Sequence, residues 1–444
     1  MIIRHYYRLL VLLVLVSLVG CTGLPFSLGD GTASGPITAT EPNVPTTPNP
    51  PLTPRVTEAT AETTPPMAGQ YLRIWLPAEF DPERNGAANR VLKTRLSEFE
   101  AENPGMQLEV RVKALDGPGG MLDALVATSA AAPEALPDLA LLPRPLLESA
   151  ALKGLLYPYD GLTQIMDNEA WFEYALQMAH LKSSTYGIPF AGDVMVLVHS
   201  LSAQKSTPLS FTGVITPGNV ILYPAAEPQS LFTLCMYLAD GGKLQDKQGR
   251  PTLEETPLLN ILEYDQQASL AEVMPYTLTQ YTDDAQVWEL LLAGQAPMAV
   301  TWTSTYLRDT RVEQANLGLA ALPTPDGAPF TLATGWSWAL SGQDSARRLM
   351  AVRLAEFLAN KDFLAEWTIA SGYVPPRVDA LQEWPLSPAR QAIEQVSYSA
   401  WLVPPDDLIS TIGPALQTAV VGVLTGQTDA QSAAQAAIKQ INQP

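Results

Sequence analysis

The sequence is poor in the residues that build metal and thiol chemistry. Its 444 residues include 2 cysteines, Cys21 and Cys235, and 3 histidines. A structural zinc site needs about four clustered ligands, usually cysteine and histidine, so we expect no metal site, and no cofactor motif stands out. Cys235 lies in the apolar run "SLFTLCMYLADGG", a pattern typical of a buried free thiol.

Basic charge is also scarce. Lysine and arginine number 26 against 45 aspartate and glutamate residues, which gives a formal net charge of −19. Nucleic-acid-binding proteins present a basic face to the phosphate backbone, so we expect no nucleic-acid partner. The acidic excess is typical of a secreted protein that stays soluble.

Catalytic motifs are missing as well. The glycine stretch "GPGG" at 117–120 is followed by no GK[ST], and neither His180 nor His199 stands beside a GxSxG elbow. Two carboxylate pairs occur, at 283–284 and 406–407, but adjacent side chains point apart, whereas a glycosidase needs two carboxyls about 5 to 9.5 Å apart. Helix N-caps or surface turns explain the pairs better. We expect that the protein is not an enzyme, and a carbohydrate-active hydrolase is the alternative function.

The first twenty residues are typical of an export signal. Arg4 and Arg8 precede an uncharged apolar stretch from Leu9 to Val19, which is shorter than the about 20 residues of a membrane-spanning helix and fits a signal-peptide core. The ending "LVGC" resembles a bacterial lipobox. This resemblance implies cleavage after residue 20 and acylation of Cys21, with palmitate or a similar chain, so that the protein is held on the extracytoplasmic face of the cell membrane.

Residues 21–69 are rich in proline, threonine and glycine. Such a composition cannot build a core and favours an extended, disordered chain. We expect a lipid-anchored linker that holds a folded part away from the bilayer.

The remainder, residues 70–444, alternates strand-like and helix-like patterns. "YLRIWLP", "MQLEVRVKAL" and "PDLALLP" are typical of strands, and "ANRVLKTRLSEFEAENPG" and "GGMLDALVATSAAA" of the helices between them. A β-α-β-α-β order predicts parallel strands with helices on both faces. Sheets of this kind bind ligands at the carboxyl ends of their strands.

A series of fragments extends this pattern to the end of the chain. In order they are "FEAENPGMQLEV", "PDLALL", "GLLYPYDGL", "YGIPF", "LLLAGQAPMAVTW", "LPTPDG", "ATGWSWALSG", "AEFLANKDFLAEWTIASGYVPPR" and "VLTGQTDAQSAAQAAIKQIN". Together they resemble the family 1 extracellular solute-binding proteins of bacterial ABC importers. The resemblance implies a monomer with the two-lobed α/β fold of type II periplasmic binding proteins, with mostly parallel sheets. It also implies ABC permease subunits as partners.

The resemblance implies domain boundaries too. Lobe one takes residues 70–198 plus 330–376, and lobe two takes 199–329 plus 377–444. The chain then crosses between lobes near His199, Pro329 and Pro375–Pro376. Hinge closure buries the solute in the cleft. In maltose-binding members a ligand-stacking tryptophan lies on the penultimate long helix, but "LISTIGPALQTAV" has none, and Trp401 is the candidate substitute.

The stretch "TGWSWALSG" at 334–342 carries two tryptophans two positions apart, and on a strand such side chains share a face. We expect Trp336 to be the exposed member and Trp338 the deeper one. Indole faces cover the C–H patches of sugar rings, and polar groups bind the hydroxyls. The predicted solute is therefore a sugar or oligosaccharide. The ligand-binding candidates at the cleft edge are Trp75, Arg144, Phe190, Asp193, Trp302, Thr303, Ser304, Trp336, Trp338, Tyr373, Arg377 and Trp401.

Other functions remain open at this point. Family members also carry polyols and glycerol phosphates, so a non-sugar solute is an alternative. A lipoprotein that presents its ligand to a sensor or acts in adhesion, without coupling to import, is another.

Overall fold

The computed structural model describes residues 70–167, 170–203, 207–216 and 218–442. The predicted signal peptide, Cys21 and the predicted linker lie outside these residues. The first strand, β1, begins at Gln70, where the folded part was expected to start.

A nine-stranded sheet runs through the described residues. Its strand order is β2-β1-β3-β10-β6-β8-β7, with β11 paired to β10 and β9 paired to β6. The strands are β1 (Gln70–Pro77), β2 (Met106–Lys113), β3 (Leu139–Pro143), β6 (Ile188–Ser200), β7 (Ile221–Leu222), β8 (Met298–Trp302), β9 (Leu317–Ala320), β10 (Thr331–Leu340) and β11 (Ala400–Leu402). A separate two-stranded sheet joins β4 (His180–Leu181) to β5 (Ser184–Thr185).

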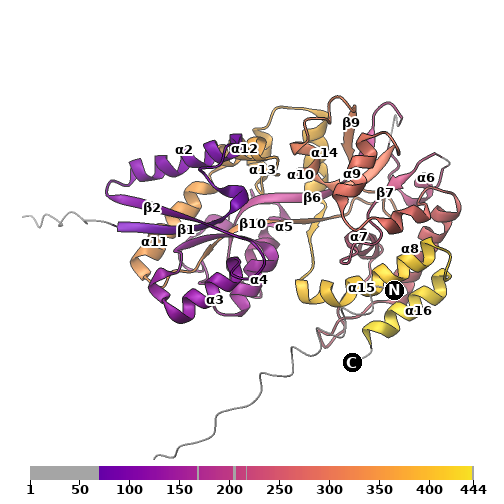
Figure 1. Cartoon of the computed structure of the whole chain (residues 1–444), viewed down its shortest axis with the longest axis horizontal. Helices are drawn as coiled ribbons and strands as arrows, with labels where there is room; N and C mark the ends of the chain where they lie inside the picture. Colours follow the sequence, from indigo (N-terminus) through magenta and orange to yellow (C-terminus); the bar gives the residue numbers. More distant parts are fainter. Residues whose placement is uncertain (1–69, 168–169, 204–206, 217, 443–444) are drawn as a thin grey trace, which may run out of the picture. The chain divides into compact units, whose positions relative to one another are not determined.

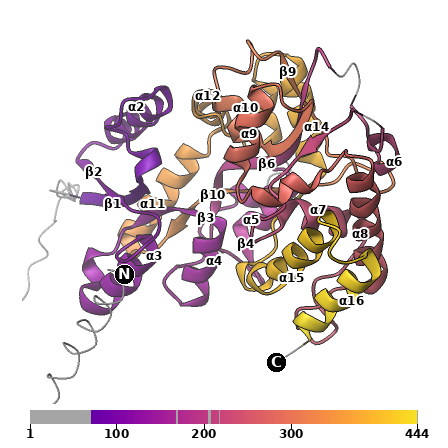
Figure 2. The same cartoon turned by 45° about the vertical axis from the view of Figure 1, so that its right-hand side comes forward.

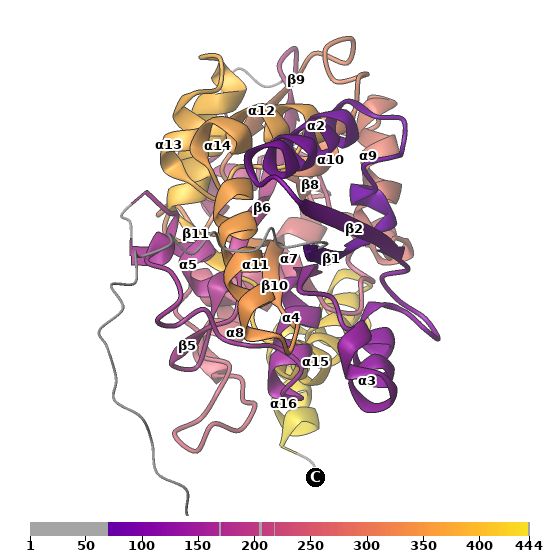
Figure 3. The ribbon, with the colours of Figure 1, turned by 90° about the vertical axis from the view of Figure 1, so that its left-hand side faces the viewer.

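Lobe one is built on the parallel strands that the sequence predicts. β1 pairs in parallel with β2 and β3, and α2 and α3 lie on opposite faces of these strands (Figures 1 and 3). α2 buries Leu92, Leu96 and Phe99, the positions whose helical spacing marked this segment. The helices of this part are α2 (Ala87–Glu102), α3 (Met121–Ala131), α4 (Arg144–Leu152), α5 (Glu173–Ala179), α11 (Ser345–Leu358) and α12 (Lys361–Ser371).

Two long strands join the lobes. The first half of β6 pairs antiparallel with β10, and from Met195 onward β6 pairs with β8 and β9. This change of partners lies before His199. Gly192 of β6 faces Gly335 of β10. A Cβ atom on Gly192 would collide with the Tyr174 hydroxyl, and one on Gly335 with the Ala191 carbonyl, so the close approach of the crossing strands requires glycine at both positions.

Lobe two collects the later strands and the C-terminal helices. β7 pairs in parallel with β8, and α15 packs beside α8 and α16 (Figure 2). Among the described helices only α15 is long and apolar enough to cross a membrane, but most of it is buried in this lobe. The helices are α6 (Phe211–Val214), α7 (Leu231–Ala239), α8 (Glu255–Leu270), α9 (Asp284–Leu292), α10 (Thr303–Arg308), α15 (Asp406–Leu424) and α16 (Ala430–Ile441), with α13 (Val378–Gln382) and α14 (Pro388–Tyr398) connecting α12 to β11.

The large sheet is mixed: β1–β2, β1–β3, β7–β8 and β10–β11 are parallel pairs, and β3–β10, β6–β10, β6–β8 and β6–β9 are antiparallel pairs. The predicted architecture, two α/β lobes joined by crossing strands, is confirmed. Cys235, in α7, is fully buried and free, and burial raises the pKa of its thiol, as expected for a core cysteine.

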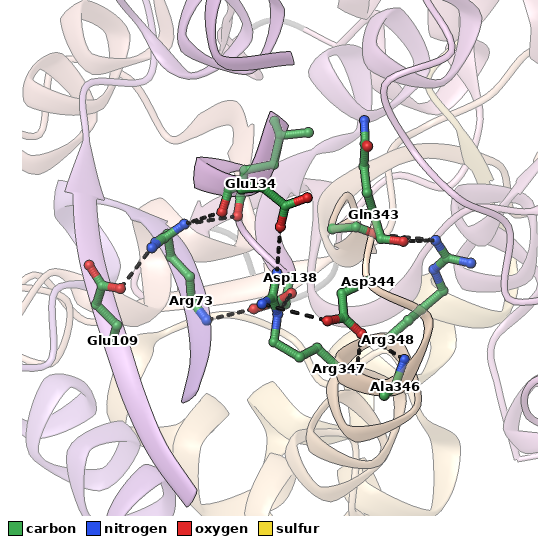
Figure 4. Close-up of polar contacts among 11 residues, drawn as sticks. Arg73, Glu109, Glu134, Asp138, Gln343, Asp344, Ala346, Arg347 and Arg348 are labelled. Carbon is green, nitrogen blue, oxygen red and sulfur yellow. Dashed lines mark hydrogen bonds and ion pairs between the residues drawn. The ribbon is translucent and has the colours of Figure 1, made fainter. Parts of the chain in front are cut away.

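A polar network closes the edge of the lobe-one sheet where β3 begins and β10 ends (Figure 4). Asp138 precedes β3 and is 1% exposed. Its carboxylate accepts hydrogen bonds from the Arg73 backbone N–H at 2.9 Å and from Arg347 Nε at 3.0 Å. Arg73 in turn pairs with Glu109 at 3.1 Å. Every charge in this interior group has a partner of the opposite sign, and the carboxyl ends of β1 and β3 point the other way.

Candidate functional site

Two adjoining cavities lie at the carboxyl ends of the strands. The first, of about 320 Å³, is bounded by α4 of lobe one, by the joining segments and by α15 of lobe two. The second, of about 520 Å³, lies in lobe two and shares three lining residues with the first. The first cavity is lined by Arg144, Pro145, Glu148, Asp193, Gln229, Leu231, Trp302, Thr334, Val403, Pro404, Asp406 and Ile409. The second is lined by Met195, Pro224, Glu227, Pro228, Gln229, Leu231, Phe232, Thr282, Asp283, Asp284, Val300, Thr301 and Trp302.

Strand ends position the central side chains of these cavities. β3 ends at Pro143 and α4 begins at Arg144, with Pro145 in its first turn. β8 ends at Trp302 and α10 begins with the next residue. Trp302 is half-buried and lines both cavities. These placements agree with the general rule that α/β sheets carry ligands at the carboxyl ends of their strands.

Asp193 ties the joining strand to lobe two. Its Oδ1 accepts hydrogen bonds from Thr303 Oγ1 at 2.8 Å and from the Ser304 backbone N–H at 2.9 Å, and its Oδ2 accepts from Ser304 Oγ at 2.5 Å. Burial raises the pKa of Asp193, and these hydrogen bonds and the Arg308 charge oppose that rise. A carboxylate oxygen can accept more than one hydrogen bond, so Oδ2 retains capacity for a donor in the cavity.

Arg144 is held mainly by backbone. Its Nη1 donates to the carbonyls of Met178 and His180, each at 2.8 Å, around the end of α5. Its Nε lies 3.9 Å from Glu148 Oε2. Burial raises the pKa of Glu148, the Arg144 charge lowers it, and the nearby Asp407 and Asp406 carboxylates raise it further.

Carboxylates also line the lobe-two cavity. Glu227 accepts hydrogen bonds from the Gln229 and Leu231 backbone N–H groups at 3.1 and 2.9 Å, at the start of α7. Burial is the main cause that raises the pKa of Glu227. Asp283 caps α9, as expected for this pair, and Asp284 accepts from Thr301 Oγ1 at 2.9 Å.

A third cavity, of about 250 Å³, lies where Arg308 of lobe two meets lobe one. Arg308 Nη2 pairs with Glu79 Oε1 at 2.9 Å, and its guanidinium stacks 4.1 Å from the ring centre of Tyr373. The Tyr373 hydroxyl donates to Glu79 at 2.9 Å and accepts from Trp336 Nε1 at 3.1 Å. Here the charges are balanced, one cation against one carboxylate.

The two tryptophans of 334–342 do share a face. Trp336 and Trp338 belong to one core cluster, where Phe80 lies 4.7 Å from the Trp336 ring centre and Phe190 lies 5.2 Å from that of Trp338. The expectation that Trp336 is exposed is wrong: it is 8% exposed, because Phe80 packs against its ring. Core packing accounts for the burial of both indoles, and contact of either with a solute stays a prediction.

The remaining candidates divide by location. Arg144, Asp193 and Trp302 line the first cavity, with Thr303 and Ser304 holding Asp193 in place. Tyr373 lines the third cavity. Contact with a solute stays a prediction for all of these.

The other four lie outside the described cavities at the strand ends. Trp75 is 1% exposed and packs in the core on the α3 side of the sheet, and Phe190 is fully buried. Arg377 pairs with Asp379, and Trp401, in β11, is 58% exposed beside Phe330. These four do not line the two cavities at the strand ends, and contact with a solute stays a prediction for them as well.

Sequence reasoning missed several lining residues. Glu227 follows β7 and could have been found as a polar residue after a strand. Glu148 stands one helical turn after Arg144, which reads as an ordinary salt bridge. Asp283, Asp284 and Asp406 were attributed to helix starts, which is correct for their local structure, yet they also line the cavities. Within the described residues no group of histidine, cysteine, aspartate and glutamate side chains is arranged to hold a metal ion.

Comparison with known proteins agrees with this architecture. Residues 94–395 match the family model described as bacterial extracellular solute-binding protein. No curated protein sequence matches the chain.

Solved structures share its fold. The sugar-binding protein MalE from Xanthomonas citri is 18% identical, with a TM-score of 0.69 over 84% of this chain and 96% of the other. The cyclic alpha-maltosyl-1,6-maltose binding protein from Arthrobacter globiformis is 16% identical, with a TM-score of 0.69 over 84% and 98%. An ABC transporter solute-binding protein from Thermotoga lettingae, bound with alpha-D-tagatose, is 20% identical, with a TM-score of 0.61 over 84% and 99%.

Proposed function

Because the chain belongs to the family of bacterial extracellular solute-binding proteins, we propose that it captures a saccharide between its two lobes for an ABC importer. The observation that carries this proposal is the first cavity, to which both lobes and the joining strands contribute side chains. The named ligands of the structural neighbours, maltose-related sugars and tagatose, support a saccharide as the solute class.

The cavity has the two kinds of surface that a sugar requires. Trp302 offers an indole beside Leu231 and Ile409 for the C–H patches of a ring. Asp193, Gln229 and the carboxylates around them offer acceptors for hydroxyl groups. A solute that touches both groups of residues binds the closed form better than the open form and so favours closure.

The same proposal covers delivery. The closed protein docks on a permease in the membrane and releases the saccharide to it, and acylated Cys21 and the residues after it keep the lobes near that membrane. The lipobox-like ending "LVGC" supports the anchor. Family membership supports both the importer and the extracytoplasmic site.

A thermal-shift screen of mono- and oligosaccharides tests the proposal, since binding to the folded state raises the melting temperature. We expect at least one saccharide to stabilise the chain. Trp302→Ala should then weaken the binding of that saccharide by about 1 to 2 kcal/mol, the order of one lost stacking contact. Titration calorimetry measures this change.

Tyr276→Ala is the control, because Tyr276 is an exposed aromatic residue outside the described cavities. It should leave the affinity unchanged. Stabilisation by peptides or polyamines with no saccharide hit would overturn the sugar assignment.

A further inference from the structure

We infer that the saccharide this cleft selects carries an amino group, and that Glu148 is the residue that recognises it. This inference rests on the proposed function and names its solute class more closely. It starts from an imbalance of charge in the two adjoining cavities. Their described lining residues include one cation, Arg144, and six carboxylates, namely Glu148, Asp193, Glu227, Asp283, Asp284 and Asp406.

Most of these carboxylates are compensated locally. Asp193, Glu227 and Asp283 accept hydrogen bonds from backbone N–H groups at the starts of α10, α7 and α9. The positive end of a helix stabilises such charges. Asp284 accepts from the Thr301 and Thr305 hydroxyls. These four groups are therefore placed as acceptors that the fold itself stabilises.

Glu148 has no such support. It stands in the second turn of α4, and its side chain is 13% exposed on the wall of the first cavity. Its nearest cationic nitrogen, Arg144 Nε, is 3.9 Å away, beyond hydrogen-bonding distance. Arg144 Nη1 donates instead to the carbonyls of Gln177, Met178 and His180, which hold the guanidinium beside the end of α5. A carboxylate of such low exposure, whose cation lies at this distance, gains from a closer cationic donor in the cavity.

The opposing wall carries the same sign of charge. Asp406 and Asp407 form the first turn of α15 in lobe two, and both repel the charge on Glu148 of lobe one. Bringing the lobes together therefore brings like charges together. An ammonium group between the walls removes this repulsion and donates hydrogen bonds to Glu148, so it couples recognition to closure.

A metal ion does not fit this arrangement, because the described residues hold no cluster of three or more potential metal ligands. The carboxylates are spread along the cavity wall, and Trp302, Leu231 and Ile409 lie among them. Such a surface suits a molecule with C–H patches, hydroxyls and a separate amine. Those are the features of an amino sugar.

The test compares matched ligands on the purified full chain. Glucosamine and its β-1,4-linked oligomers each have an N-acetylated counterpart that is similar in size but uncharged. We expect some member of the amine series to bind about tenfold or more tightly than its counterpart at low salt, the order of one charged hydrogen bond. Added salt should reduce the difference.

Glu148→Gln should bring the two series to within about threefold of each other, since the amide keeps the shape but removes the charge. Glu263→Gln is the same change at an exposed site on α8. It should leave the difference in affinity between the amine and the acetylated series unchanged. An amine preference that survives Glu148→Gln would overturn the role of this residue.

The other outcomes separate the two proposals. Equal or tighter binding of the acetylated series, or of maltodextrins while the amine series fails, would overturn the amino-sugar inference and leave saccharide capture intact. Binding of spermidine with no saccharide bound would overturn both the saccharide class and this inference.

Discussion

Carboxylates at the two edges of the lobe-one sheet have opposite surroundings. At the edge where β3 begins, Asp138 is almost fully buried, and Arg347 lies 3.0 Å from it. At the edge where β3 ends, the Glu148 side chain is 13% exposed, and its nearest cationic nitrogen, Arg144 Nε, is 3.9 Å away, while Arg144 Nη1 donates to backbone carbonyls. At the first edge the protein itself supplies a cationic partner for the buried carboxylate. On the inference above, a solute in the cleft completes the second edge.

The difference teaches how one fold separates stability from binding. Paired charges in the interior contribute little net energy but penalise any rearrangement that breaks them, so the Asp138 network fixes lobe one. A carboxylate without a close cationic partner still gains interaction energy when a solute supplies one. The substitutions below test whether this contrast is real, beginning with the largest expected effect.

Asp265 of α8 extends the comparison to a buried carboxylate outside the described cavities. Its Oδ2 has no hydrogen-bond partner among the described residues, and burial raises the pKa of Asp265 to about 8. The unfolded chain releases this proton near pH 4, so between about pH 4 and 8 the folded state binds more protons. Stability therefore falls as pH rises through this range, by several kcal/mol in order of magnitude.

Asp265→Asn removes this dependence. Denaturant unfolding should show the variant gaining stability over the parent at pH 8 and much less at pH 5. Glu263→Gln, exposed on the same helix, is the control and should follow the parent at both values. A variant less stable than the parent at pH 8 would show that Asp265 is paired and charged in the folded chain.

Arg347→Met tests the complete edge. It removes the side chain that pairs with Asp138 and leaves a buried carboxylate without its cation. The loss should be about 3 kcal/mol in the free energy of unfolding, as for other broken buried pairs. Arg353→Met on α11 removes an exposed arginine and should change stability little. Similar losses of unfolding free energy in the two variants would contradict a stabilising role of the Asp138 network.

Much of the fold could be predicted from the sequence because it follows local periodicity. The spacing of Leu92, Leu96 and Phe99 marks α2, and the alternation of strands and helices predicts the parallel pairing of β1, β2 and β3. The resemblance of ordered fragments extends this to two lobes. The partner change within β6 was not predictable in detail, because it depends on which distant strands reach Val194 and Met195.

The site was predictable only in part. The polar residues after β3, in β6 and after β8, namely Arg144, Asp193 and Ser304, could be found because the carboxyl ends of strands meet at one edge. The burial of Trp336 could not, since Phe80 and Tyr373, which cover it, come from remote segments. Nor could the 3.9 Å distance between Arg144 Nε and Glu148, since it depends on the carbonyls around the end of α5 that accept from Arg144 Nη1.

The central claim is that both lobes close on one solute, and hydrogen–deuterium exchange measures this most directly. With the saccharide that stabilises the chain most in the thermal screen, we expect slower exchange on both sides of the first cavity. The affected segments should be the start of α4 in lobe one, and residues 302–305 and the first turn of α15 in lobe two. Protection confined to one lobe, or absent from both, would contradict the account.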